Sequence, residues 1–117
     1  MTARGSAGVV LSTTDSVPGY QVETVLGVVS AEWVGGVNVF RDMFAGIRNI
    51  VGGRSAALEK EMKAGREAVL QELQQRAAEL GADAVVTIRL DSSPISGGSG
   101  AMLMLGAIGT AVRLRRA

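Results

Sequence analysis

Alternation of apolar and polar residues marks both ends of this chain. A period of two is typical of β-strands, and turn-forming residues such as Pro18-Gly19 separate the alternating segments. The stretch over 92–100 holds Pro94 and three glycines, and it is expected to be a loop. The pattern predicts four strands, over residues 9–11, 20–31, 83–91 and 101–114.

The middle of the chain has a helical period instead. Between 37 and 51, apolar residues recur at helical spacing, which predicts a short amphipathic helix. A second stripe predicts a long helix over about 56–80, with Ser55 as its N-cap and Gly81 at its end. Gly52-Gly53 is then expected to be a hinge between the two helices. These elements indicate an α+β fold in which a sheet packs on one long helix.

The last predicted strand is apolar on both faces. Met102 and Ile108 share one face, whereas Leu103 and Leu105 share the other. One long helix covers only one face of a small antiparallel sheet, and a contiguous exposed apolar face is rare on a monomer. Either the 37–51 helix or neighbouring subunits must cover the second face. We favour subunits, so a homo-oligomer is expected.

The sequence lacks two residue types that often bind metals or take part in catalysis. The 117 residues include no cysteine and no histidine, which excludes disulfides, thiolate or imidazole metal ligands and the usual general base. The net charge of +1 gives no reason to expect nucleic acid as a partner. The terminal Arg113, Arg115 and Arg116 are expected to be solvated. No catalytic residue is marked out, which disfavours an enzyme.

Length and hydropathy favour a single domain. Residues 1–7 are expected to form a flexible leader, and 8–117 the domain. The longest apolar run, 101–112, has 12 residues, against the about 20 that a membrane span needs. No secretory signal is visible, so a cytoplasmic protein without a membrane span is expected.

Several blocks of the sequence together resemble the YbjQ-like family. The resemblance covers about residues 9–115 without large gaps. Each block alone is a weak signal, but the combination and order are specific. The blocks are GVNVFRD at 36–42, IRNIVGGRS at 47–55, LEKE at 58–61, LGADAVV at 80–86, MLM at 102–104 and GTAV at 109–112.

This resemblance implies a dodecin-like β-α-β-β subunit with an extra N-terminal strand, assembled as a ring-forming homopentamer. The family is labelled a heavy-metal-binding domain, and its function is unknown. The sequence departs from the family pattern at three positions. Leu58 replaces an expected aromatic residue, Gly65 an expected alanine and Thr87 an expected glycine. None of the three is expected to change the fold.

Candidate ligand or interface residues lie mainly in the central blocks. Their arginines could hold a carboxylate or phosphate with two hydrogen bonds, but ion pairing within or between subunits is the favoured interpretation. The Gly52–Ser55 stretch lacks the longer glycine loop and the lysine of a phosphate loop. The candidates are Asn38, Arg41, Asp42, Arg48, Gly52, Gly53, Arg54, Ser55 and Glu59.

The residue types in this sequence give little support for the binding of a heavy metal. Heavy metals prefer thiolate, thioether or imidazole ligands, and the methionines are expected to pack in the core. Glu32, Asp42 and Asp91 are candidate oxygen ligands for a divalent metal, although no acidic group has the spacing of a calcium loop. No cofactor is predicted.

The leading hypothesis is therefore a non-enzymatic homo-oligomeric module, with a pentamer expected from the resemblance. It would bind a small ligand, an ion or a partner. The alternatives are a carboxylate-based metal-binding protein and an enzyme that acts at subunit junctions without histidine or cysteine.

Overall fold

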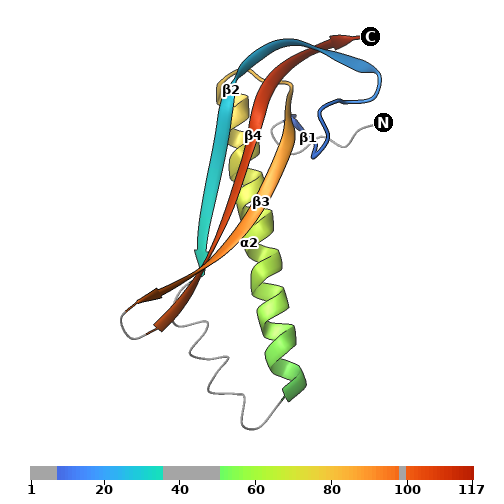
Figure 1. The fold of residues 1–117 in the computed structure, drawn as a ribbon. Coiled ribbons are helices and arrows are strands. Elements are labelled where there is room, and N and C mark those ends of the chain that lie inside the picture. The colour runs from blue at the N-terminus through green and yellow to red at the C-terminus, as the bar shows by residue number, and fades with distance from the viewer. Residues whose placement is uncertain (1–7, 36–50, 98–99) are drawn as a thin grey trace.

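A four-stranded mixed sheet forms one layer of the fold, and a long helix forms the other (Figure 1). The computed structural model describes the backbone of residues 8–35, 51–97 and 100–117, and the side chains of these residues except 51–58, 95–97 and 100–101. The strands lie in the order β1-β3-β4-β2, with β4 antiparallel to both β2 and β3, and β1 parallel to β3. The elements are β1 (Val10–Leu11), β2 (Tyr20–Gly35), α2 (Val51–Glu79), β3 (Ala84–Gly97) and β4 (Gly100–Arg116).

The hairpin of β3 and β4 is longer than the sequence pattern predicted. The expected loop over 92–100 is wrong for most of its length, because β3 continues through Pro94 to Gly97 and pairs with β4 throughout. A proline is tolerated here because β1 pairs with β3 only at Ala84 and Val85. At Pro94 the strand is therefore an edge strand, where a missing N–H costs no ladder hydrogen bond.

Helix α2 begins at Val51, earlier than expected. Gly52-Gly53 lies inside its first turns, so the predicted hinge is wrong and Ser55 is not at the helix boundary. Glycine lowers helix propensity by only about 1 kcal/mol, and continued backbone hydrogen bonding overcomes this cost. The predicted helix over 37–51 lies outside the described residues apart from its last position. Across the part of the chain that is described, no helix is long and apolar enough to cross a membrane.

Helix α2 ends just before Gly81, the glycine that was predicted to end it. Gly81 has a φ of 80°, a left-handed conformation that glycine adopts without strain. The N–H of Ala82 donates to the carbonyl of Ala77, and the N–H of Gly81 donates to that of Ala78. This Schellman arrangement satisfies the last helical carbonyls and turns the chain into β3.

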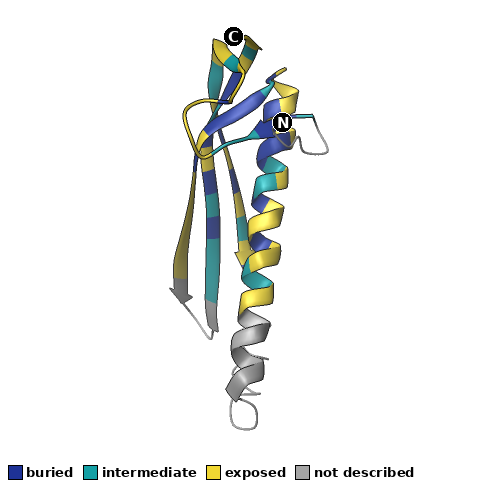
Figure 2. Ribbon diagram, turned by 90° about the vertical axis from the view of Figure 1, so that its right-hand side faces the viewer, coloured by how far each residue is buried: buried dark blue, intermediate teal, exposed yellow. Residues whose placement is uncertain are grey.

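The main core lies between α2 and the sheet. Val69, Leu73 and Ala77 of the helix are almost fully buried against Val85 and Ala111 of the strands. Figure 2 shows these buried positions along the side of the helix that faces the sheet, with exposed residues on the opposite side. The 3.6-residue stripe of the sequence therefore marks the face that packs on the sheet.

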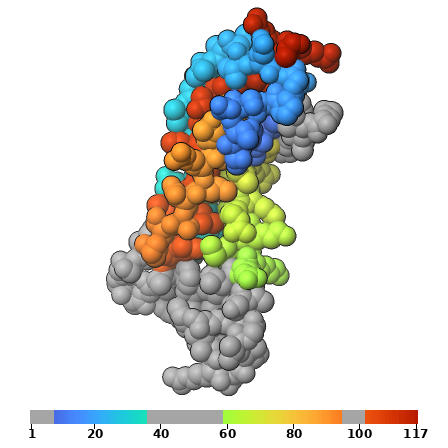
Figure 3. Space-filling view, turned by 45° about the vertical axis from the view of Figure 1, so that its right-hand side comes forward, coloured from blue at the N-terminus to red at the C-terminus, as the bar shows by residue number. Residues whose placement is uncertain are grey.

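A second, smaller core covers the opposite face at one end of the sheet. Val10, Val86 and Val112 pack there beneath Val17, which belongs to the loop between β1 and β2. Figure 3 shows this N-terminal segment lying against β3 at that end. Part of the second apolar face is therefore covered by the chain itself, which the sequence analysis did not anticipate.

Three register shifts let one sheet carry both cores. Strand β2 shifts between Val22 and Thr24 and again between Val25 and Gly27, and β3 shifts between Val86 and Arg89. A shift of one residue moves every later side chain to the opposite face. Strict alternation along β2 would place Leu26 and Val28 on the same face. Instead Leu26 packs against the main core, whereas Val28 is 69% exposed.

Candidate functional site

From Val25 of β2 and Arg89 of β3 onward, the sheet face that points away from α2 has a mixed polar and apolar surface. We call this surface the outer face. Its residues come from the three long strands and pair across them in register, as Ser30, Ile108 and Arg89 do. The outer face comprises Val25, Val28, Ser30, Glu32 and Val34 of β2, Met104, Gly106 and Ile108 of β4, and Arg89, Asp91 and Ser93 of β3.

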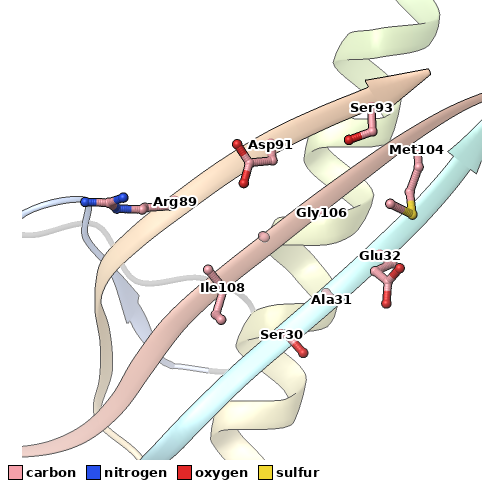
Figure 4. Close-up of a pocket in the computed structure, with 10 residues that line it drawn as sticks. Ser30, Ala31, Glu32, Arg89, Asp91, Ser93, Met104, Gly106 and Ile108 are labelled. Atoms are coloured by element: carbon pink, nitrogen blue, oxygen red, sulfur yellow. The ribbon is translucent and has the colours of Figure 1, made fainter.

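A shallow depression of about 300 Å³ lies in the middle of the outer face (Figure 4). Gly106 occupies its centre, between Glu32 on β2 and Asp91 on β3 in the strand register. Because glycine has no side chain, the floor of the depression is open backbone between two carboxylates. Ser30 and Ser93 complete its polar rim, and the thioether of Met104 also lines it.

Charges of both signs meet around the depression. Arg89 lies two residues before Asp91, so the two side chains emerge on the same face of β3. Glu32, Arg89 and Asp91 are all exposed. Among the described residues the one ion pair is Arg76 with Glu72 on α2, so these three charges are not paired within the described part of the chain.

The structure brings together two of the residues singled out from the sequence. Glu32 and Asp91, both named as candidate oxygen ligands, line the same depression. Glu59 is exposed on α2, away from that depression's lining. Gly52, Gly53, Arg54 and Ser55 belong to the first turns of α2, and Asn38, Arg41, Asp42 and Arg48 lie outside the described residues.

Sequence reasoning missed the role of Gly106 and Arg89. Gly106 was one glycine among sixteen, and only its pairing with Glu32 and Asp91 shows that it opens the depression. The alternation of Arg89, Asp91 and Ser93 was a usable signal of a polar strand face. It was obscured because the segment from Ser92 was expected to be a loop.

Two comparisons with known proteins bear on this fold. The model of the YbjQ family, described as "Putative heavy-metal-binding", matches residues 9–115. A crystal structure of a protein of unknown function of the DUF74 family, from Pediococcus pentosaceus, has a TM-score of 0.59 with this chain. The two share 13% sequence identity, and the match covers 92% of this chain and 99% of the other. At this identity the likeness shows the fold alone.

The residues present do not fit a heavy metal. Soft metals select thiolate, thioether and imidazole donors, yet the chain has neither cysteine nor histidine. The described residues contain no cluster of three or more acidic, histidine or cysteine side chains. In the depression, Met104 offers one thioether as the only soft donor, and the guanidinium of Arg89 on the same face weakens the attraction for a soft metal ion.

Proposed function

Because this chain belongs to the YbjQ family, we propose that it is a non-enzymatic module that works as a homo-oligomer, in a ring of five copies. Its role would be to bind a small ligand, an ion or a partner. One observation carries the proposal: the outer face exposes large apolar side chains that nothing in the described part of the chain covers. Val25 is 63% exposed and Val28 69% exposed.

The arrangement of these apolar residues supports a buried contact. Val25, Val28 and Ile108 lie on one side of the depression, and Val34 lies on the other. Burying apolar surface is favourable by roughly 25 cal/mol per Å², so several half-exposed valines give a substantial driving force for association. Apolar patches of this kind on soluble proteins commonly mark interaction sites.

Native mass spectrometry and light scattering of the wild-type protein test this proposal. We expect a discrete oligomer, and we expect Val28→Lys to shift it toward monomer while circular dichroism stays unchanged. Val28 contributes to neither core, so its replacement should not unfold the subunit. Leu80→Lys is the matched control, because Leu80 is 47% exposed at the end of α2 and away from the outer face. A wild-type monomer of 12.1 kDa would contradict the proposal.

A second candidate function is carboxylate-based binding of a divalent metal. The observation that favours it is the shared position of Glu32 and Asp91 on either side of Gly106. Hard cations such as Ca²⁺ and Mn²⁺ prefer such oxygen ligands. Calorimetric titration with Mn²⁺ should then show binding that the Glu32→Gln, Asp91→Asn double variant loses. Equal heats of Mn²⁺ binding for the wild type and the double variant would exclude this site.

A further inference from the structure

A trough crosses the outer face at the depression, perpendicular to the strands. On β4, the bare backbone of Gly106 lies between Met104 and Ile108, which are two residues away on either side and therefore share its face of the sheet. Figure 4 shows Met104 and Ile108 on opposite sides of Gly106 along the strand. The trough therefore has a floor without a side chain and an apolar wall on each side.

The two ends of the trough carry negative charge. Glu32 of β2 and Asp91 of β3 each pair in register with Gly106, so they lie at opposite ends of one row across the sheet. Because neighbouring strands lie about 4.8 Å apart, the Cα atoms of Glu32 and Asp91 are separated by about 10 Å. Both side chains are exposed, and neither carboxylate has an ion-pair partner within the described ranges of the chain.

Arg89 lies beside one end of the trough without occupying it. Its register partner on β4 is Ile108, and Figure 4 shows its guanidinium directed away from Gly106. Two carboxylates and one guanidinium give the lining of the depression a net charge of −1. A positively charged ligand is therefore favoured over an anion.

We infer that the trough binds a linear alkyl diamine in its doubly protonated form. This inference rests on the proposed binding of a small ligand and names the chemical class of that ligand. One ammonium group donates hydrogen bonds to Glu32 and the other to Asp91, and the carbon chain lies over Gly106 between the two apolar walls. A spacer of roughly four to six carbons spans the trough once a hydrogen bond of about 2.8 Å is allowed at each end.

The shape of the trough favours a rod-shaped dication over a compact metal ion. A divalent metal requires both carboxylates within about 2.0–2.6 Å of one point, whereas a diamine meets Glu32 and Asp91 at separate ends. The walls of Met104 and Ile108 add to this preference. Burial of methylene groups against them is favourable, and a hydrated ion has no such groups to bury.

Calorimetric titration with diaminobutane and diaminopentane at low ionic strength tests the two ends of the trough. Glu32→Gln and Asp91→Asn should each weaken binding by about threefold to fivefold, the effect of one exposed ion pair, and the double variant by the product of the two. Butylamine, with one ammonium group, should bind at least about threefold more weakly than diaminobutane. Glu23→Gln, which removes an exposed carboxylate of β2 outside the depression, is the matched control. Equal binding by the wild type and the double variant would overturn the inference.

Gly106→Val separates the trough from a general attraction between charges. A Cβ at this position meets nothing closer than the carbonyl oxygen of Ala31, at 3.9 Å, and valine suits a strand, so the fold should accept the change. Both carboxylates stay in place, but the floor is filled. Diamine binding should fall by about tenfold with an unchanged circular dichroism spectrum, and Gly106→Ala should give a smaller loss. Unchanged binding by Gly106→Val would overturn the inference.

Arg89→Gln tests the sign of the ligand's charge. Removal of the guanidinium should tighten diamine binding by about twofold to threefold, because a like charge beside Asp91 is lost. Loss of diamine binding in this variant would overturn the inference.

The oligomeric state of the same samples separates this inference from the proposed function. A discrete oligomer that gives no heat with either diamine would overturn the diamine site and leave the proposed module standing. A wild-type monomer whose diamine binding depends on Glu32 and Asp91 would support the site and contradict the proposed oligomer.

Discussion

Gly65 of α2 allows side chains of the sheet to pack closely against the helix. A Cβ at this position would lie 2.6 Å from Cδ1 of Leu105 and 2.6 Å from Cε3 of Trp33. The family pattern leads one to expect alanine here, but in this chain the indole of Trp33 fills the space. The cost of a glycine inside a helix is offset by the close packing that it allows.

We predict that Gly65→Ala lowers the free energy of unfolding by about 1 kcal/mol, although alanine is the better helix former. The gain in helix propensity is about 1 kcal/mol, and overpacking costs about 1–3 kcal/mol. Urea denaturation measures the difference. In a protein that already carries Trp33→Leu, Gly65→Ala should no longer lower the free energy of unfolding. If Gly65→Ala alone is more stable than the wild type, the side chain of Trp33 moves aside at little cost.

Thr87 is strained in a way that its residue type does not favour. Its φ is 55°, which places a β-branched residue in the left-handed region, and its side chain is exposed. Such a conformation costs a non-glycine residue about 1–2 kcal/mol. The backbone N–H of Thr87 donates to the carbonyl of Thr14 at 2.9 Å, so the conformation is held by the N-terminal loop.

Replacing Thr87 by glycine should therefore stabilise the chain, by about 0.5–1 kcal/mol after the entropy of the freer unfolded chain is subtracted. Thermal and urea unfolding would show a higher midpoint. Ser92→Gly, at an exposed position in the same strand, should be destabilising instead. If both glycines lower stability equally, Thr87 is not strained.

Among the elements, β1 is the shortest and depends on α2. It has two residues, and the buried Gln74 of the helix donates from Nε2 to the carbonyl of Val9 at 3.0 Å. That bond joins the helix to the segment that covers the second core. The helix therefore positions the N-terminal segment as well as the sheet.

Gln74→Leu should cost about 1–3 kcal/mol, because it leaves the buried Val9 carbonyl without its donor. The loss should be local, so hydrogen exchange at Val10 and Ser12 should accelerate more than exchange in β4. Gln75→Leu, at an exposed position on the same helix, is the control. Uniform acceleration across the sheet would indicate global destabilisation instead.

The helix and strands also show which features of the fold the sequence pattern could predict. Periodicity located the strands and the long helix because it follows from one buried face per element. It could not locate the bulges near Gly27 and Thr87, since these depend on which partner each backbone group meets. For the same reason, alternation alone would place Val28 on the face of Leu26, although Leu26 packs against the main core and Val28 is exposed. Pro94 was taken as a strand breaker because edge position is a property of the sheet, not of the residue.

For the whole molecule, the candidate site was only half predictable. Glu32 and Asp91 could be named as oxygen ligands from their residue type, but they lie 59 positions apart and meet only through their pairing with Gly106. The apolar surface was predicted as a face in need of cover. That the chain covers one end of this face itself, through Val17, followed only from the tertiary structure.

At the scale of the whole molecule, the absence of cysteine and histidine leads to a prediction about the binding of soft metal ions. The untagged protein, titrated with Zn²⁺ or Cd²⁺, should show no stoichiometric binding and no rise in melting temperature, because a ligand stabilises a fold only when it binds the native state. A tag of histidines would bind these ions itself, so the tagged protein is the positive control. One equivalent per subunit retained through dialysis would show a site that assembly creates from several copies.

The register shifts near Gly27 and Thr87 bear on how this fold can diverge. They separate the end of the sheet that is packed on both faces from the half that carries the outer face. Changes at Ser30 or Ser93 would alter the chemistry of the depression without disturbing either core. Evolution can therefore exchange the ligands of this surface while the architecture persists, so that descendants of one ancestor share a shape and differ in what they bind.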